Sequence, residues 1–226
     1  MQMKIIARIY TGFPEKFGVP RQSGIAENRG KIIFEPEYRI KEAVRGLDGY
    51  EYIWLIWMFD KAVREKWSPT VRPPRLGGNT RMGVFATRSP FRPNPIGLSA
   101  VRLDRVEMTA EYGPVLHVTG ADLIDGTPIF DIKPYLPFAD SKPDAAAGFS
   151  DAVRDYSLSV EFPENAEKTV EPEILSSLKS VLSHDPRPAY HDNADRLYGM
   201  EYCGYSVKFT VDENMVSVTQ IIRIKA

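Results

Sequence analysis

The first 134 residues of this chain consist mainly of apolar runs of strand length with short polar connections between them, which leaves little room for a long helix. Chains with many short strands and short connections fold into sandwiches or barrels. We therefore predict a mainly β fold built on an antiparallel β-barrel, with one brief helical stretch at residues 41–45. The strands are expected at Lys4–Tyr10, Lys31–Phe34, Tyr52–Phe59, Met82–Thr87, Gly97–Met108, Val115–Gly120 and Thr127–Lys133.

Two of the expected strands show patterns other than simple alternation. The run Tyr52–Phe59 is apolar throughout, which is typical of a strand buried on both faces, so its aromatic residues Trp54, Trp57 and Phe59 are assigned to the core. In the strand at 97–108, the apolar residues change phase after Leu103. A change of phase predicts a β-bulge, which is common where a sheet curls.

The composition changes at residues 139–150, A-D-S-K-P-D-A-A-A-G-F-S, where small and polar residues replace the apolar runs. This stretch indicates a boundary between two units and not an element of either. We therefore expect two domains, a barrel domain over residues 1–145 and a C-terminal domain over residues 146–226.

The C-terminal residues predict a small α+β domain. A strand is expected near Ser159–Phe162, followed by a helix over Glu171–Leu182 whose apolar residues share one face. The final segments at 205–211 and 216–224 alternate between apolar and polar residues around a turn at 212–214. This pattern predicts a β-hairpin at the end of the chain.

The charge is segregated along a chain that is close to neutral overall. The 226 residues carry a net charge of −1, which argues against a strongly basic nucleic-acid-binding protein. Between residues 61 and 92, however, eight Lys or Arg residues face the single acid Glu65, whereas residues 93–150 carry eight acids and four bases. The basic segment is suited to phosphate contacts, and equally to solvated arginines that pair with the acids after them.

Cysteine and histidine are scarce. Cys203 is the only cysteine and there are three histidines, so neither a disulfide framework nor a Cys/His metal cluster can be assembled. We expect no metal and a reducing compartment. The N-terminal residues lack the apolar stretch of a signal peptide, and no apolar run approaches the ~20 residues of a membrane span. A soluble cytoplasmic protein with no membrane partner is expected.

The segment at 81–99, R-M-G-V-F-A-T-R-S-P-F-R-P-N-P-I-G-L-S, places three arginines and three prolines between two strand-like runs. Each proline fixes its own φ and favours extended geometry in the residue before it. The stiff loop holds Arg88 and Arg92 at low entropic cost, and guanidinium groups bind carboxylates or phosphates well. The alternative is a proline-rich surface connection with solvated arginines.

The common nucleotide-binding and nucleophile motifs are absent. The chain has no G-x-G-x-x-G loop between a strand and a helix, no G-x-x-x-x-G-K-[ST] and no G-x-S-x-G. What remains is a set of polar loops at strand ends. They are P-R-Q at 20–22, the arginine loop described above, and D-L-I-D-G-T-P-I-F-D-I-K-P-Y at 122–135.

The last of these loops is acidic. Asp122, Asp125 and Asp131 could hold a ribose or an amine, or act as a base, whereas their spacing does not fit a calcium loop. The alternative is that Asp125-Gly126-Thr127-Pro128 is an ordinary hydrogen-bonded turn with no ligand.

Four long motifs are specific to one family: F-P-E-K-F-G-V-P-R-Q, V-R-P-P-R-L-G-G-N-T-R-M-G-V-F-A-T-R-S-P-F-R-P-N-P-I-G-L-S, D-L-I-D-G-T-P-I-F-D-I-K-P-Y-L-P-F and D-P-R-P-A-Y. With these motifs the chain resembles the TrmO/TsaA-like family, the tRNA N6-methyltransferases of bacteria. The resemblance implies a β-barrel enzyme that uses S-adenosylmethionine (SAM) and differs from Rossmann-type methyltransferases. It also implies a homodimer and a tRNA substrate that carries threonylcarbamoyladenosine beside the anticodon.

The resemblance further implies a set of SAM contacts. Arginines suit the methionine carboxylate, carboxylates suit the ammonium group and the ribose hydroxyls, and backbone groups suit the adenine. Asp60 departs from the family pattern, which usually has a histidine there. The implied contacts are Pro20, Arg21, Gln22, Asp60, Lys61, Arg88, Leu98, Asp125, Gly126, Thr127 and Pro128.

The acceptor nitrogen suggests which catalytic group is needed. The N6 atom of threonylcarbamoyladenosine is urea-like, so its attack on a methyl group is easier if its proton is removed. We expect in-line transfer that depends mainly on positioning, with Asp125, Asp131 or Asp185 assisting deprotonation, or none of them.

Three residues are candidates for contacting tRNA. Arg187 and Tyr190 lie in the proline-braced turn D-P-R-P-A-Y, where the arginine could meet a phosphate and the tyrosine could stack on a base. Arg92 in the stiff loop is the third. The alternative for the turn is a helix stop with surface charges.

Two other functions remain open. A non-catalytic SAM- or RNA-binding barrel module would bind SAM without turnover. A small-molecule methyltransferase would be indifferent to tRNA and would show little salt sensitivity. The interpretation we adopt is a SAM-dependent methyltransferase that acts on N6 of threonylcarbamoyladenosine in tRNA.

Overall fold

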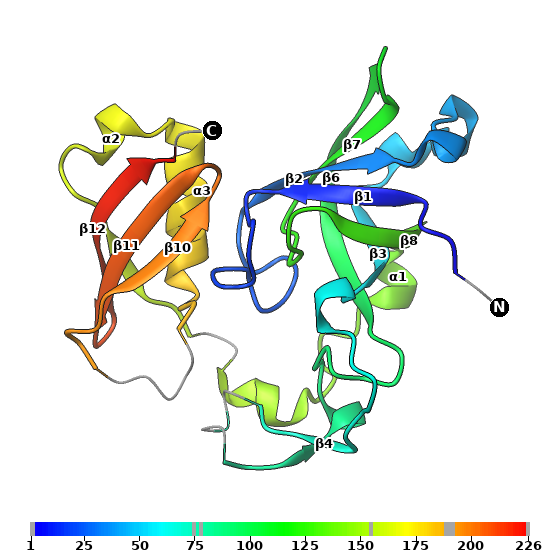
Figure 1. Ribbon diagram of the computed structural model, residues 1–226. Coiled ribbons are helices and arrows are strands. Elements are labelled where there is room, and N and C mark those ends of the chain that lie inside the picture. Colours follow the sequence, from blue (N-terminus) through cyan, green and yellow to red (C-terminus); the bar gives the residue numbers. More distant parts are fainter. Residues whose placement is uncertain (1–2, 74–75, 77–78, 154–155, 188–192, 225–226) are drawn as a thin grey trace.

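Two β-rich units lie side by side in the molecule (Figure 1). One is a closed barrel formed by the N-terminal part of the chain, and the other is a four-stranded sheet with a helix packed against it. Among the described residues, no helix combines the length and the apolarity that crossing a membrane requires. The structure is a computed structural model that describes residues 3–73, 76, 79–153, 156–187 and 193–224.

Six antiparallel strands close the barrel in the order β1-β2-β7-β6-β3-β8, which confirms the predicted fold class. Side chains that point inward form a single apolar core. Three short 3₁₀ turns, Pro36–Tyr38, Lys41–Val44 and Leu47–Gly49, connect β2 to β3 where one brief helical stretch was expected. The strands are β1 (Ala7–Thr11), β2 (Arg29–Phe34), β3 (Tyr52–Met58), β6 (Ile96–Thr109), β7 (Gly113–Thr119) and β8 (Thr127–Pro134).

The long strand β6 changes partners along its length. It pairs with β3 over its first half, and its pairing with β7 runs only from Arg102 to Thr109. The register with β7 shifts between Leu103 and Arg105, which confirms the predicted bulge. Over Ile96–Val101, β6 therefore extends beyond the end of β7, which is Thr119.

The expected burial of β3 on both faces is wrong. Exposure alternates along the strand, and Ile53, Leu55 and Trp57 are the residues that point into the core. Trp54 lies on the outer face, where its indole Nε1 donates to Oδ2 of Asp140 at 2.9 Å. The indole N–H needs an acceptor, and it finds one outside the barrel. The core assignment holds for Trp57, while Phe59 packs against the core.

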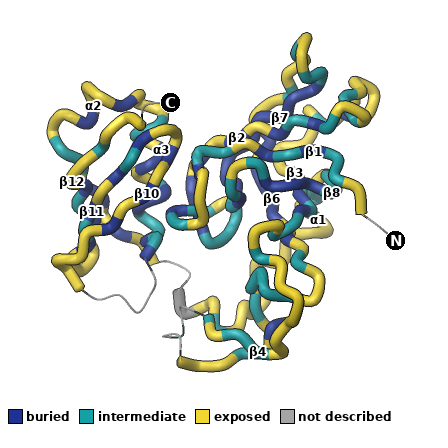
Figure 2. The backbone as a smooth tube through the Cα atoms, in the orientation of Figure 1, coloured by how far each residue is buried: buried dark blue, intermediate teal, exposed yellow. Residues whose placement is uncertain are grey.

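The strand expected at Met82–Thr87 is shortened to Met82–Gly83 (β5), which pairs with Thr70–Val71 (β4) outside the barrel. A 3₁₀ turn follows at Val84–Ala86, because the backbone N–H and the hydroxyl of Thr87 both donate to the carbonyl of Val84. The β4–β5 ribbon lies in an arm, residues 60–95, which extends away from the barrel on the side opposite the β6–β7 hairpin (Figure 1). More than half of its described residues are exposed (Figure 2).

The second unit contains a sheet in the order β10-β11-β12-β9, in which β9 runs parallel to β12. The predicted strand, helix and final hairpin are confirmed. Strand β10 was not predicted, since its five residues Y-G-M-E-Y are few and include a glycine. Its elements are β9 (Ser159–Glu161), α2 (Ala166–Thr169), α3 (Pro172–Ser183), β10 (Tyr198–Tyr202), β11 (Tyr205–Asp212) and β12 (Met215–Arg223). Between the two units along the chain, α1 (Pro137–Asp140) lies beside the barrel (Figure 1), and a 3₁₀ turn follows at Gly148–Val153.

The loop between β1 and β2 packs into the core of the second unit. Phe13 and Ala26 are buried among its apolar side chains, and the ring of Phe13 lies 5.0 Å from that of Tyr202. The backbone N–H of Cys203 donates to the carbonyl of Gly12 at 2.9 Å, and no side chain would fit at that glycine. The loop that carries P-R-Q is therefore held by both units. The division of the chain at residue 145 stays a prediction.

Candidate functional site

The proline-rich loop is folded back on itself by its own side chains. Nη1 of Arg92 donates to the carbonyl oxygens of Val84 and Thr87, at 3.1 and 2.7 Å. The Arg92 guanidinium also lies 5.7 Å from the ring centre of Phe85. Arg92 therefore braces the loop from within, whereas the exposed Arg88 is the arginine that the loop presents to another element.

Arg88 meets the P-R-Q segment of the β1–β2 loop. Its Nη1 donates to Oε1 of Gln22. The preceding Arg21 is bound to the second unit, because its Nη2 donates to the carbonyl oxygens of Asp185, at 3.1 Å, and of Arg187. The tertiary structure thus brings two predicted site residues, Gln22 and Arg88, into contact. The neighbouring Pro20 is buried.

A chain of three polar side chains leads from the barrel core toward Arg88. The indole Nε1 of Trp57 donates to Oγ of Ser99 at 2.9 Å, and Oγ of Ser99 donates to Oδ1 of Asp122 at 2.5 Å. Trp57 is 4% exposed and Ser99 is 1% exposed. Burial raises the pKa of the Asp122 carboxyl, while the hydrogen bond from Ser99 and the charge of Arg88 act in the opposite direction.

Asp122 is one of the three loop acids predicted as able to hold a ribose or an amine, but it is not among the SAM contacts that the family resemblance implies, and no role was predicted for Ser99. Two signals could have found them. Ser99 is a polar residue in the inward phase of β6, the phase of Val101. Asp122 is a charged residue between Ala121 and Leu123, both of which are buried in the barrel core.

The Asp125–Pro128 segment forms a hydrogen-bonded turn that ties β8 to β1. Oδ1 of Asp125 accepts the backbone N–H of Thr11 at 2.8 Å. Gly126 has a φ of 76°, a left-handed conformation that favours glycine. Thr127 and Pro128 are buried. Of the three side chains in this segment, only that of Asp125 is exposed, so ligand contacts by the other residues would come from the backbone.

The other predicted barrel residues lie on outer surfaces. Oδ2 of Asp131 forms an ion pair with Nζ of Lys133 at 2.9 Å. Asp60 and Lys61 are exposed in the 3₁₀ turn Asp60–Ala62. Leu98 is 57% exposed and points to the face of β6 opposite Ser99.

Asp185 and Arg187 form a buried ion pair in the second unit. Nε and Nη2 of Arg187 donate to the two carboxylate oxygens at 2.8 and 3.1 Å, and the hydroxyl of Tyr156 donates to Oδ2 at 3.0 Å. Burial acts to raise the pKa of Asp185, but the hydrogen bonds and charge of Arg187 outweigh it and hold that pKa below its usual value. The predicted tRNA contact Tyr190 lies outside the described residues.

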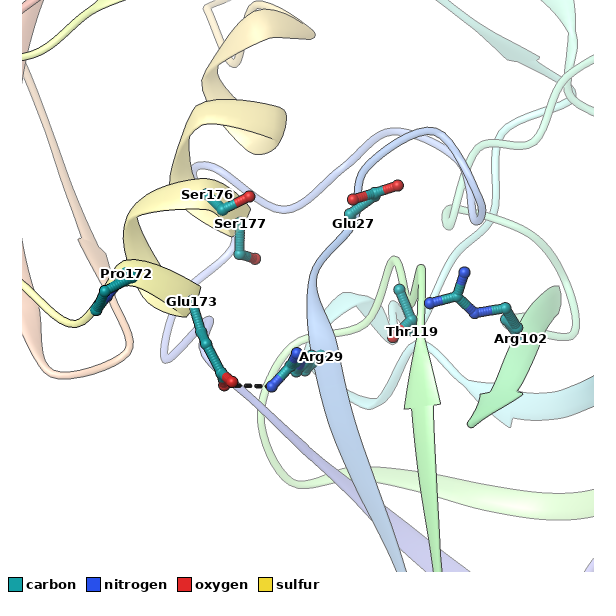
Figure 3. Close-up of a pocket in the computed structure, with 8 residues that line it drawn as sticks. All are labelled: Glu27, Arg29, Arg102, Thr119, Pro172, Glu173, Ser176 and Ser177. Atoms are coloured by element: carbon teal, nitrogen blue, oxygen red, sulfur yellow. Dashed lines mark hydrogen bonds and ion pairs between the residues drawn. The ribbon is translucent and has the colours of Figure 1, made fainter. Parts of the chain in front are cut away.

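A separate cavity of about 340 Å³ lies between the barrel and α3 (Figure 3). Two carboxylates, Glu27 and Glu173, and two guanidinium groups, Arg29 and Arg102, line it, so its charges balance. Arg29 forms an ion pair with Glu173 across the cavity and connects the two units. None of the site residues predicted from the sequence is among the described residues that line this cavity.

Several known proteins are similar to this chain. A protein of Escherichia coli (strain K12) named tRNA (adenine(37)-N6)-methyltransferase is 41% identical over 221 residues, which cover 94% of each chain. A Pseudomonas aeruginosa protein provisionally named S-adenosylmethionine-dependent methyltransferase RcsF is 40% identical over 86% of each chain. The crystal structure of TrmO from Pseudomonas aeruginosa matches with a TM-score of 0.78 and 31% identity, covering 98% of both chains.

Two family models match consecutive parts of the sequence. The tRNA-methyltransferase O N-terminal domain matches residues 8–141, which include all six barrel strands except the first residue of β1. The TrmO C-terminal domain matches residues 155–224, which include the four-stranded sheet and α3. The motifs, the barrel and both matches agree, and the chain belongs to the tRNA-methyltransferase O family.

Proposed function

We propose that this chain transfers the methyl group of SAM to N6 of threonylcarbamoyladenosine at position 37 of tRNA. The chain is a methyltransferase of the TrmO family that acts on adenosine 37 of tRNA. The threonylcarbamoyl group on the acceptor is the finer part of the proposal, and it rests on the motifs quoted above.

The contact between Gln22 and Arg88 is the observation that carries the methyl-donor site. Three segments far apart in sequence converge there: the β1–β2 loop, the proline-rich loop and the chain after β7. A guanidinium group has five N–H donors, of which Gln22 takes one. The others can bind the carboxylate of SAM in the bidentate geometry that arginine favours. When bound, SAM supplies the electrophilic methyl group.

We infer that the arm receives the tRNA. Trp67 and Phe85 are 50% and 72% exposed, and their rings lie 6.1 Å apart. The guanidinium carbon of Arg64 lies 3.5 Å from the ring centre of Phe91. Exposed aromatic rings among basic residues are typical of surfaces on which unpaired bases stack. The excess of basic residues in this part of the chain suits the phosphates that accompany those bases.

We propose that positioning, and not a protein base, dominates the chemical step. The three carboxylates that could assist deprotonation all have partners, since Asp125 accepts the N–H of Thr11, Asp131 pairs with Lys133 and Asp185 pairs with Arg187. Each of these carboxylates is therefore engaged within the fold, and positioning of the two substrates is the contribution that the site can make. Alanine variants at these three positions that bind SAM but have lost turnover would contradict this view.

A cytoplasmic homodimer is also proposed. Ile96 and Leu98 are 39% and 57% exposed on the outer face of β6, where a second copy of the chain could cover them. Light scattering of the purified protein, compared with a Leu98→Lys variant, tests the dimer. A wild-type mass equal to that of one chain would contradict it.

The function itself is tested with methyl-labelled SAM and two pools of tRNA, one with and one without threonylcarbamoyladenosine. After incubation, the tRNA is digested and its nucleosides are analysed by mass spectrometry. We expect label on threonylcarbamoyladenosine in the first pool alone. Label on unmodified adenosine would contradict the finer substrate assignment, and SAM binding without label in either pool would favour a binding module.

A further inference from the structure

Asp122 lies at the point where the candidate methyl-donor site meets the barrel core. It follows β7, and the β1–β2 loop lies against this segment, because the backbone N–H of Gly24 donates to the carbonyl of Gly120 at 2.8 Å. The charge of Arg88 and the backbone N–H of Ser23 both favour the ionised form of its carboxyl. Ser23 is the neighbour of Gln22, which accepts a hydrogen bond from Arg88. The P-R-Q loop therefore brings the Arg88 guanidinium and the Asp122 carboxylate to the same end of the barrel.

The hydrogen bonds determine which oxygen of Asp122 is already occupied by the protein. An indole N–H only donates, so the oxygen of Ser99 must accept from Trp57 and its single hydrogen must point to Oδ1 of Asp122. Oδ1 is therefore an acceptor, which favours the ionised carboxylate. Ser99, which is held by Trp57, donates to Oδ1 from the core side, so a ligand would meet the carboxylate at Oδ2.

The hydrogen-bonded side chains Trp57, Ser99 and Asp122 lie where β6 extends beyond the end of β7. Ser99 lies in the part of β6 that does not pair with β7, and Asp122 lies in the segment that continues from β7. The hydrogen bond between Ser99 and Asp122 joins these two segments. This hydrogen bond holds the carboxylate in a fixed position at the end of the barrel that Arg88 and the P-R-Q loop share, as recognition of a small charged ligand requires.

We propose that Asp122 binds the α-ammonium group of SAM while Arg88 binds its α-carboxylate, with Ser99 as the positioning residue for Asp122. This inference rests on the proposed methyl donor. The amino-acid end of SAM is a zwitterion, and an adjacent carboxylate and guanidinium complement its two charges in sign. Each contact is a charge-assisted hydrogen bond, the strong class in proteins.

The alternative is that Asp122 only fastens β6 to the segment after β7. Two nucleoside ligands separate the roles. S-adenosylhomocysteine carries the amino-acid zwitterion, whereas 5′-methylthioadenosine has the same nucleoside and sulfur but no amino-acid part. A residue that recognises the ammonium group affects only the first ligand, and a residue that shapes the pocket affects both.

The test measures the affinity of both ligands by isothermal titration calorimetry for the wild type, Asp122→Asn and the exposed control Asp48→Asn. We expect Asp122→Asn to weaken S-adenosylhomocysteine about 10- to 100-fold, as loss of a hydrogen bond between charged groups does. Affinity for 5′-methylthioadenosine should stay within about twofold, and the control should match the wild type for both ligands.

A second measurement uses only the folded wild-type protein. An S-adenosylhomocysteine analogue without the amino group should bind the wild type as weakly as S-adenosylhomocysteine binds Asp122→Asn. Equal losses for both nucleosides, or equal wild-type affinity with and without the amino group, would overturn the role of Asp122 alone. Failure of the wild type to bind S-adenosylhomocysteine at all would overturn the donor site and this inference together.

Discussion

The buried ion pair between Asp185 and Arg187 provides a quantitative test of how the second unit is held together. The two side chains are only 12% and 10% exposed. Replacement of Arg187 by Met keeps an apolar stem of similar length but removes the charge, so that the carboxylate of Asp185 stays buried with Tyr156 as its main remaining donor. Loss of one partner from a buried pair costs about 3–5 kcal/mol.

The assay is urea unfolding followed by circular dichroism, with the free energy taken from the midpoint and the slope. The matched control is Arg29→Met, which removes the exposed ion pair with Glu173, whose side chains are 68% and 70% exposed. Exposed pairs contribute about 0–1 kcal/mol. We therefore expect a much lower urea midpoint for Arg187→Met and almost no change for Arg29→Met.

The effect should also depend on pH in a definite direction. The pKa of Asp185 lies below its usual value in the folded chain, so folding favours the ionised carboxylate. Its contribution to stability is present above the ordinary Asp pKa of about 3.9 and is lost as pH falls through the folded value. The stability difference between wild type and Arg187→Met should narrow at acidic pH. A difference below about 1 kcal/mol at neutral pH, or one that widens in acid, would refute this reasoning.

Three further predictions concern the barrel and the arm. Gly97→Ala should destabilise the fold by about 1–3 kcal/mol, because an added methyl group would overlap the indole ring of Trp57. A lower melting temperature and a shift in Trp57 fluorescence would show this. Gly126→Ala is the control, since the space there is open but φ is 76°, and it should cost about 1–2 kcal/mol without the fluorescence shift. Trp67→Ala should weaken tRNA binding by about 1–3 kcal/mol in a filter assay and leave S-adenosylhomocysteine binding intact, and equal losses for both ligands would contradict a stacking role. Arg64→Ala should reduce the slope of log affinity for tRNA against log salt by about 1, and an unchanged slope would remove Arg64 from the phosphate contacts.

Local patterns predicted most of the fold. The change of phase in β6 predicted its bulge, and the alternation in β11 and β12 predicted the final hairpin, because both features depend on residues close together in sequence. The apolar run of β3 was less informative about burial, since Trp54 counts as an apolar residue but its indole N–H donates to Asp140 outside the barrel. Composition does not distinguish an indole in the core from one that needs a surface acceptor.

The predicted site was identified in part. Motif positions predicted Gln22 and Arg88 as SAM contacts, and the structure places these two side chains in contact, while their role in binding SAM stays a prediction. They gave no sign that Arg187 is committed to Asp185, or that Arg92 braces its own loop. Whether an arginine is free to bind a ligand depends on the acceptors around it, and those acceptors are supplied by the folded chain.

The sequence by itself therefore determined the barrel, the appended α+β unit and the family, because periodicity and long motifs are properties of neighbouring residues. Only the tertiary structure decided which side chains meet. Arg88 and Gln22 are 66 residues apart, Ser99 and Asp122 are 23 apart, and Arg21 reaches a carbonyl 166 residues away. Such contacts depend on how the strands close and on how the β1–β2 loop enters the second unit, which no local propensity encodes.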